Sequence, residues 1–510
     1  MAVFGQIASM ISRILEFQNS GGCFFRCLKW IYTVAVIYFF HDDGREKRLL
    51  MKVFCQKEFV QEFLKMMKKI LTMLVMCLAA VAMAEYTIEL QDDMKIRLGG
   101  DIRARYEGYT FNVAAPDVDK DGRHSTEYFR IRTRLWGAFD FGEDVTFNLR
   151  LANRFHYVTT SPNRDNNNGK STWEFPDEVY VDAANVEIRN LLDGLLTIKL
   201  GRQDLGFGNG MLFAEGTPFD QGRSVFTDGI TLKFKTENDT LTIFTLYDEW
   251  KDRTVFINDR NRRLRSANIF TQGVYWTHKF DPTFNVDVYY MFNDVDDKQP
   301  ESAERAHFAD TSTSLHTAGL RFFGKYSIVD YSLEGAHQFG RGAHGEHLDA
   351  DMIDARLNIH LYDDSDFKPI LGFNYTHFSG DDPGTGRLEG WNPLMTQCPL
   401  WGEELMPIML NGMWSNLESL RTFVSFNVIN DLKFTLSATD YLADEKNSAV
   451  AGMAPTGGGD HVGLLLSAIA SYKIMDNMSI LGYVSHFMAG DYFANGHDSY
   501  WFRLELNVAF

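Results

Sequence analysis

The chain has 510 residues, with 50 lysines and arginines against 68 aspartates and glutamates, so its formal net charge is −18 at pH 7. This acidic balance argues against generic nucleic-acid binding, which needs a basic surface. Beyond residue 84 the sequence has no apolar run long enough for a membrane-spanning helix, so any membrane span there has to be made by strands.

A secretory signal peptide is predicted at residues 67–84. The segment has Lys68 and Lys69, then an apolar core, then the A-x-A cleavage site Ala82-Met83-Ala84. Its apolar stretch is too short to span a membrane as a stable helix. The mature protein is therefore expected to begin at Glu85.

Residues 1–66 precede this signal peptide, although a signal peptide is normally read at the N-terminus. We expect translation to start at Met67 and residues 1–66 to be an over-extended reading frame. The alternative is a genuine N-terminal region anchored by residues 30–40, a run shorter than the roughly 20 residues of a spanning helix. A lipoprotein modified at Cys77 is another alternative, disfavoured because Met76 stands where a small residue is expected.

Removal of residues 1–84 makes the chain more acidic. That stretch holds 11 of the 50 basic and 6 of the 68 acidic residues, so 39 basic and 62 acidic residues remain, a net charge of −23. Of the five cysteines, only Cys398 stays in the mature chain. An intrachain disulfide framework is therefore excluded.

Residues 85–510 are predicted to form an all-β fold, a transmembrane antiparallel β-barrel. Apolar Val145, Phe147, Leu149 and Leu151 alternate with polar or small residues, which is typical of a strand with one apolar face. About 18 such strands are expected, near 94–109, 127–141, 145–156, 178–189, 195–205, 225–236, 239–248, 267–279, 283–293, 313–323, 326–339, 351–362, 367–379, 417–429, 432–442, 461–474, 478–488 and 499–510.

The connections favour a barrel over a soluble β-sandwich, whose strands would alternate in the same way. Short turns, such as those around Gly142 to Asp144 and Gly324-Lys325, alternate with long polar segments such as 157–177 and 380–416. Single-chain outer-membrane barrels have short periplasmic turns and long extracellular loops. A barrel of 16–18 strands encloses an aqueous lumen, and the 14% aromatic content fits interfacial girdles.

A ladder of basic residues is predicted on the inner face of the first three strands. Its members are Lys95, Arg97, Arg103, Arg105, Arg130, Arg132, Arg134, Arg150 and Arg154. One interpretation is structural: inward carboxylates such as Asp101, Glu107 and Asp140 pair with them. The other is a track for an anionic or polyhydroxylated solute, because an arginine fork matches a carboxylate bidentately.

Three segments resemble the alginate export family of outer-membrane porins. They are Leu98 to Gly108, the arginine-rich Phe129 to Leu135, and Leu196 to Ile230, which contains Gly201-Arg202-Gln203. The resemblance implies an 18-stranded barrel with a positively charged bore that exports a polyuronate passively. It also implies substrate or lumen roles for Lys199, Arg202 and Arg223.

Two points within this region stay open. Arg202 has the parity of lipid-facing Leu200, so either a bulge at Gly201 re-aims it or it lies outside the lumen. The glycine-rich segment 206–224 is either a plain extracellular loop or a loop that folds into or over the pore.

A calcium site is a further hypothesis. Asp117, Asp119 and Asp121 have the spacing of the front half of a calcium loop, but the twelfth position is Tyr128 rather than a glutamate. Other loops would have to complete the site, and a solvated acidic loop is the alternative. No other cofactor is expected, and the sequence has no nucleophile elbow, P-loop or dinucleotide fingerprint, so we predict no enzyme.

The final strand alternates to the last residue. Its apolar positions are Phe502, Leu504, Leu506, Val508 and Phe510, separated by polar residues such as Arg503 and Glu505. Such an ending resembles the assembly signal of outer-membrane barrels. The expected partners are outer-membrane lipid, the barrel assembly machinery and an anionic saccharide, and the expected location is the bacterial outer membrane. The alternative function is a general or uptake porin for small anions or oligosaccharides.

Overall fold

The computed structural model describes residues 86–90, 93–109, 126–158, 177–213, 226–259, 268–296, 312–342, 345–362, 365–393, 414–449, 455–494, 496 and 498–510. The predicted reading-frame extension (1–66) and the signal peptide (67–84) lie outside these residues. Within them, no helix is long and apolar enough to cross a membrane.

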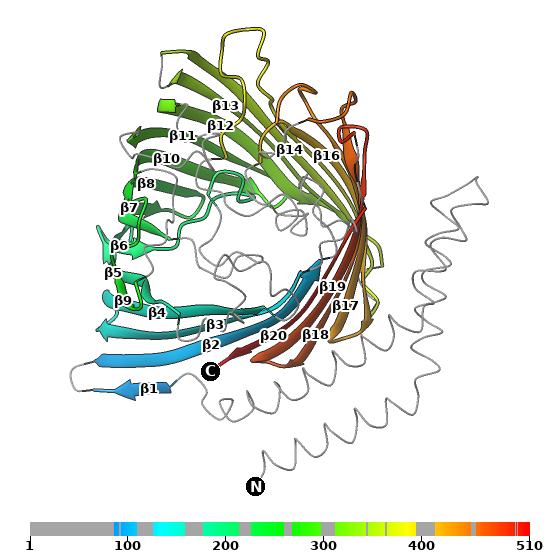
Figure 1. Cartoon of the computed structure of the whole chain (residues 1–510). Helices are drawn as coiled ribbons and strands as arrows, with labels where there is room; N and C mark the ends of the chain where they lie inside the picture. The colour runs from blue at the N-terminus through cyan, green and yellow to red at the C-terminus, as the bar shows by residue number, and fades with distance from the viewer. Residues whose placement is uncertain are drawn as a thin grey trace, which may run out of the picture. The chain divides into compact units, whose positions relative to one another are not determined.

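Eighteen of the twenty strands close into one antiparallel barrel (Figure 1). Each strand pairs with the next along the chain, and the last strand returns to the first, so that blue and red strands lie side by side in Figure 1. The barrel strands are β2 (Met94–Tyr109), β3 (Thr126–Phe141), β4 (Val145–Val158), β5 (Val179–Leu191), β6 (Leu196–Gln203), β7 (Thr227–Lys235), β8 (Asp239–Asp248), β10 (Asn268–Asp281), β11 (Phe284–Asp296), β12 (Ser312–Tyr326), β13 (Val329–Gly342), β14 (His347–His360), β15 (Ile370–Phe378), β16 (Leu417–Ile429), β17 (Leu432–Leu442), β18 (His461–Met475), β19 (Met478–Ala489) and β20 (Ser499–Ala509). The predicted fold class and strand count are confirmed.

Two short strands lie at the barrel's edges. Strand β1 (Tyr86–Glu89) pairs with the start of β2. Strand β9 (Val255–Ile257) pairs with Val179 and Tyr180 of β5, beyond the point where β6 ends. Because β6 has only eight residues, β9 takes the place beside β5 that a longer β6 would occupy.

Alternation along each strand separates an outer apolar face from an inner polar face. Leu135 of β3 is 54% exposed, whereas Arg132 on the opposite face of the same strand is 4% exposed. Leu98 of β2 and Leu149 of β4 are exposed in the same way. Apolar side chains exposed all round a barrel are typical of a surface that contacts lipid.

Strand boundaries agree with the predicted ones to within four residues. The turn expected at Gly324-Lys325 is wrong: β12 continues to Tyr326, and the turn follows at Ser327, whose φ is +53°. Gly324 instead lies inside the strand, where a Cβ would come within 2.0 Å of the carbonyl oxygen of Thr283. The glycine therefore reflects a close backbone approach and not a turn.

The C-terminal residue lies at the seam that closes the barrel. Phe510 donates its backbone N–H to Gly100 O at 2.9 Å and accepts from Gly100 N at 2.7 Å. A Cβ on Gly100 would lie 2.8 Å from the Phe510 ring. On β20, the predicted assembly-signal residues Leu504, Leu506 and Val508 are buried on the face opposite Arg503 and Glu505.

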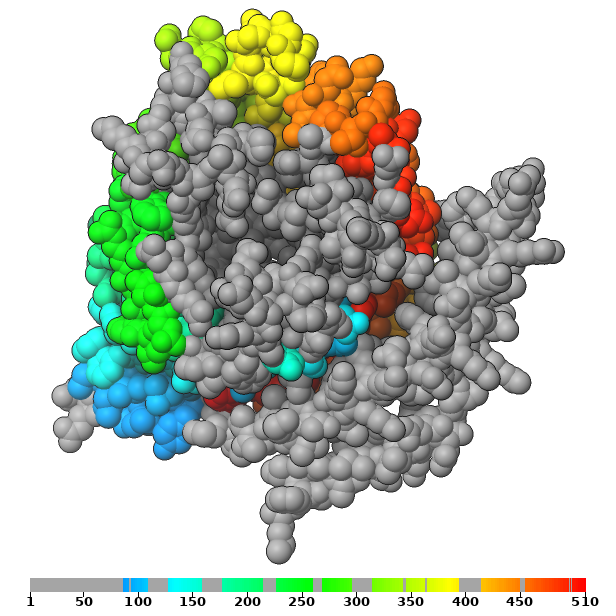
Figure 2. All heavy atoms as spheres, viewed as in Figure 1, coloured from blue at the N-terminus to red at the C-terminus, as the bar shows by residue number. Residues whose placement is uncertain are grey.

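Long connections gather at one rim of the barrel. The segments that follow β15 and β17, yellow and orange, lie next to each other in the space-filling view (Figure 2). The backbone N–H of Gly380, in the first segment, donates to Asp444 Oδ2 in the second at 2.8 Å. In single-chain barrels the rim with the long loops is the extracellular one.

Candidate functional site

The inner faces of β20, β2, β3 and β4 carry a concentration of positive charge, which we call the arginine-rich wall. Its ten described basic side chains are Lys95, Arg97, Arg103, Arg105, Arg130, Arg132, Arg134, Arg150, Arg154 and Arg503. Its four described acidic side chains are Asp101, Glu107, Asp140 and Glu505. Among the described side chains of these four strands, the basic ones thus exceed the acidic ones by six, in a chain whose net charge is −18.

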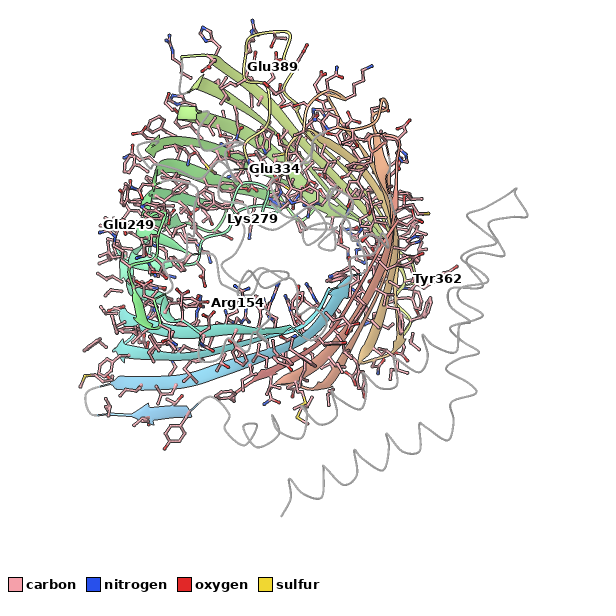
Figure 3. The ribbon with its side chains drawn as sticks, viewed as in Figure 1. Arg154, Glu249, Lys279, Glu334, Tyr362 and Glu389 are labelled. Carbon is pink, nitrogen blue, oxygen red and sulfur yellow. The ribbon has the colours of Figure 1, made fainter. Side chains whose placement is uncertain are left out.

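Strand register places several of these arginines directly opposite one another. Arg103 pairs in register with Arg132, and Arg132 pairs with Arg154 on its other side. Arg105 is likewise opposite Arg130. Figure 3 shows Arg154 pointing from β4 into the space that the barrel encloses. Like charges directly across a strand pair are destabilising, so the wall needs compensation from elsewhere.

Buried carboxylates supply part of that compensation. Asp101 pairs with Arg134 at 2.7 Å and with Arg132 at 3.1 Å. Glu107 accepts from Arg503 Nε at 2.6 Å and lies 3.7 Å from both Arg105 and Arg130. Arg105 also forms an ion pair with Glu505 across the closing seam. The carboxylates expected from the sequence are thus among the pairing partners.

Arg132 has more donors than partners. Only its Nη2 reaches Asp101, and among the described residues neither its Nε nor its Nη1 has a hydrogen-bond partner, although both atoms are buried. An unsatisfied buried donor costs roughly 1–3 kcal/mol. These two N–H groups could bind a carboxylate bidentately.

The flanks of the wall are better matched. Arg97 donates to both oxygens of Asp140, at 2.8 and 3.1 Å. Arg150 pairs with Asp182 at 2.5 Å and with Asp204 at 3.0 Å. The excess positive charge is therefore concentrated in the part of the wall around Arg132.

Lys199 and Arg202, expected from the family resemblance, both lie on β6. Lys199 pairs with Glu187 at 2.9 Å. Arg202 is 8% exposed, and its guanidinium donates to Asp228, Asp252, Thr254 and the carbonyl of Val181. Gly201, with φ +113°, precedes it.

Arg202 therefore connects several parts of the chain at the point where β6 ends and the chain leaves the barrel wall. It stacks on Phe226 at 3.7 Å and joins β5, β7 and the segment before β9. The remaining residue of this group, Arg223, lies outside the described residues.

Residues 204–213 follow β6, and we call them the inward segment. Asp204 still pairs with Arg150, whereas the residues from Leu205 on pack against the inner wall on the other side of the barrel. Phe207 stacks on Tyr275 with centroids 4.4 Å apart and planes 9° apart. Asn209 Nδ2 donates to Ser332 Oγ and to Asp354 Oδ2, both at 2.9 Å. For residues 206–213, these contacts agree with the second of the two alternatives, a loop that folds into the pore, whereas 214–224 lie outside the described residues.

The wall that receives this segment, on β10 to β14, is a second polar cluster that sequence reasoning did not identify. Tyr275 donates to Asp287 at 2.6 Å, and Tyr289 donates to Glu334 at 2.9 Å. Arg321 pairs with Asp287. Alternation placed Asp287 and Tyr289 on one face of a strand, but no sequence signal indicated which side chains would meet.

The rim with the long connections carries a group of carboxylates. Partial burial, together with the nearby carboxylates of Asp382, Asp444 and Glu389, raises the pKa of Glu445 above its usual value. The predicted calcium ligands Asp117, Asp119 and Asp121 lie outside the described residues. Within the described part of the chain, two groups combine histidine and carboxylates at metal-ligand spacing: His337 with Asp349 and Asp351, and His377 with Glu418 and Asp444.

Comparison with known proteins identifies one family and several solved barrels. The family model described as Alginate export matches residues 94–506. No curated protein sequence matches the chain. Pseudomonas aeruginosa OpdQ superposes with a TM-score of 0.51 at 12% identity, covering 81% of this chain and 98% of OpdQ. OccK9 (OpdG) from the same organism has a TM-score of 0.52 at 11% identity, covering 81% of this chain and 98% of OccK9. P. aeruginosa OpdL has a TM-score of 0.50 at 14% identity, covering 81% of this chain and 98% of OpdL. At these identities the likeness shows the fold alone.

Proposed function

Because this chain belongs to the alginate export family and has the barrel fold of outer-membrane porins, we propose that it is a channel through which an anionic saccharide crosses the outer membrane passively along the arginine-rich wall. The observation that carries the proposal is the excess of ten basic over four acidic side chains on that wall, with two unused donors on Arg132. Family and fold are those of channels and not of enzymes.

The physical argument concerns how a confined positive surface acts on a polyanion. A lumen of one charge sign, enclosed by low-dielectric walls, raises the local concentration of counter-ions. Arginines on neighbouring strands β2, β3 and β4 place several guanidinium groups within reach of one carboxylate, with Arg132 offering two donors that the described residues leave unused. Permeation needs binding that is favourable enough for entry and weak enough at each site for release. A wall with many positive charges, most of them partly neutralised by carboxylates, meets both requirements for a uronate chain.

A second candidate is a porin for small anions or short oligosaccharides. The inward segment favours it, because residues 204–213 occupy part of the lumen and are held there by Phe207 and Asn209. A polymer needs a path that stays open along the whole bore, whereas a small solute can pass beside a packed segment. The arginine-rich wall serves an anion in either case.

The test is ion selectivity of the purified barrel in planar bilayers. Replacing Arg132 and Arg154 by glutamine should shift the reversal potential toward cation preference and weaken block by added polyuronate. The effect should shrink as salt rises, since the screening length is about 10 Å at 0.1 M. The matched control is Arg97→Gln, because Arg97 also faces inward but is matched to Asp140.

Unchanged selectivity of a folded Arg132→Gln, Arg154→Gln barrel would remove the argument for an anionic solute. The two candidate functions are separated by solute size. Liposomes containing the barrel should release entrapped polyuronate if the polymer is the substrate. Release of monomeric uronate alone, with retention of the polymer, favours the second candidate.

A further inference from the structure

Three residues from neighbouring strands meet on the extracellular rim, away from the lumen. His377 is the penultimate residue of β15, Glu418 is the second residue of β16, and the two are direct cross-strand partners. Asp444 follows β17 by two residues. Both strand residues share a face with outward residues that are exposed, Phe373 on β15 and Leu420 on β16. The cluster is therefore distinct from the arginine-rich wall.

The three side chains approach closely without forming hydrogen bonds to one another. His377 Nδ1 lies 3.4 Å from Glu418 Oε1 and 3.8 Å from Asp444 Oδ1. Among the described residues this buried nitrogen has no hydrogen-bond partner. The imidazole nitrogen thus faces two carboxylates at ion-pair distance and makes a hydrogen bond to neither.

Other histidines on the same rim behave differently. His337 Nδ1 is 2.9 Å from Asp351, and His461 Nε2 is 2.8 Å from Asp440, both ordinary hydrogen-bond distances. A histidine whose only task is to pair with a carboxylate closes to contact, as these two do. The wider spacing around His377 leaves room for an atom between the three groups.

That spacing matches the coordination geometry of a small divalent cation. Zinc binds imidazole nitrogen and carboxylate oxygen at about 2.0–2.2 Å, and tetrahedral ligands at such distances are about 3.4 Å apart. We propose that His377, Glu418 and Asp444 form a divalent-cation site of the zinc type that joins β15, β16 and the segment after β17. Calcium suits the site less, because it takes six to eight oxygen ligands.

The surrounding structure fixes the proposed ligands. The second carboxylate oxygen of Asp444 accepts from the backbone N–H of Gly380 at 2.8 Å, which orients the first oxygen toward His377. Asn416 accepts from Glu445 N at 2.6 Å and donates to the carbonyls of Glu445 and Ser448. Such outer contacts orient metal ligands and contribute to affinity.

The second histidine group supplies a control and not a second site. His337 already bonds to Asp351, and Asp349 pairs with Arg387 at 3.0 Å. The imidazole and one carboxylate there are thus satisfied by the protein. His337→Asn should therefore leave specific cation binding unchanged.

The experiment measures Zn²⁺ bound by the full mature barrel after equilibrium dialysis, together with the temperature of its heat-modifiable mobility shift. The wild type should bind one Zn²⁺ that Glu418→Gln loses, with affinity reduced at least about tenfold. Zn²⁺ should raise the transition temperature of the wild type and of His337→Asn but not of Glu418→Gln.

A second variant keeps the test decisive if Glu418→Gln fails to assemble. Asp444 lies outside the strands, and in Asp444→Asn the amide oxygen can still accept from the backbone N–H of Gly380. It should also lose the ion. Equal Zn²⁺ binding by the wild type and both variants, or a temperature shift with Ca²⁺ but none with Zn²⁺, would overturn the proposal.

Discussion

The arginine-rich wall and the opposite wall on β10 to β14 differ in how far their inward charged side chains are paired. In the first, ten basic side chains stand against four acidic ones, and Arg132 has unused donors. In the second, each central carboxylate has a donor: Asp287 has Tyr275 and Arg321, Glu334 has Tyr289, and Asp354 has Asn209 and Arg356. The first wall has basic charge in excess, whereas in the second each central carboxylate has at least one donor. Among the described residues, only Asp287 Oδ1 and Glu334 Oε2 of these carboxylates are buried without a hydrogen-bond partner.

This difference indicates different tasks for two walls of one barrel. Arginines fixed opposite each other cost stability unless something else neutralises them. A permeating anion can do so, which is why excess charge suits a conduction path. The wall on β10 to β14 has hydrogen bonds and aromatic faces that hold the inward segment. Charge there serves packing, so the two walls should respond differently to substitution.

The largest expected effect follows from removing compensation in the arginine-rich wall. Glu107 is 1% exposed and contacts Arg105, Arg130 and Arg503. Glu107→Gln should cost about 3–5 kcal/mol of unfolding free energy, because it leaves buried positive charge without its partner. On the opposite wall, Glu334→Gln should cost only about 1 kcal/mol, since the amide oxygen can still accept from Tyr289. Urea unfolding in detergent measures both, and equal losses would contradict the distinction.

The next effect tests the faces of the arginine-rich wall itself. Leu149 of β4 is 37% exposed on the outer face, and Asn148 lies on the inner face, bonded to Asn185. Leu149→Arg should cost roughly 2–4 kcal/mol at the bilayer midplane, whereas Asn148→Arg faces water. The yield of folded barrel on a heat-modifiable gel compares the two variants. Similar yields would show that the register assigned to β4 is wrong.

Period-2 alternation and the lengths of the connections together were sufficient to predict the barrel. Side-chain parity fixes the face, and the regular change between short turns and long connections fixes the topology, so strand number and boundaries followed from local sequence. The failure at Gly324 has a non-local cause. That glycine is required by the carbonyl of Thr283, about 40 residues away in the chain, and no local pattern carries this information.

The candidate site was predictable in its charge but not in its pairing. Alternation placed nine basic residues on one inner surface, and Arg503 joined them only because the barrel closes β20 onto β2. Whether an arginine keeps unused donors depends on small differences in the distance to its partner. That partner can be 400 positions away in the chain, as Glu505 is from Arg105. Sequence spacing contains nothing about such contacts.

A smaller effect is expected when the inward segment is loosened from the wall on β10 to β14. Phe207→Ala removes the stacking on Tyr275, and such ring pairs contribute about 0.5–1.5 kcal/mol. The population of released segment should rise by up to about tenfold, and single-channel conductance should show more frequent large openings. Phe373→Ala, on the outer face, is the control. An unchanged conductance pattern would mean that the segment does not limit the pore.

The smallest effect on the pore should come from the seam, although its effect on assembly is large. Phe510 ends the strand that carries Arg503, but its ring packs on Gly100 and its backbone bonds to the same residue. Deleting Phe510 should reduce the yield of inserted barrel, because the closing contact and the terminal aromatic are lost together. Barrels that do insert should keep wild-type conductance and anion selectivity, since the arginine-rich wall contributes its charge from other residues. If selectivity fell along with yield, the charge of that wall would depend on the closure of the seam, and the two properties could no longer be treated as separate.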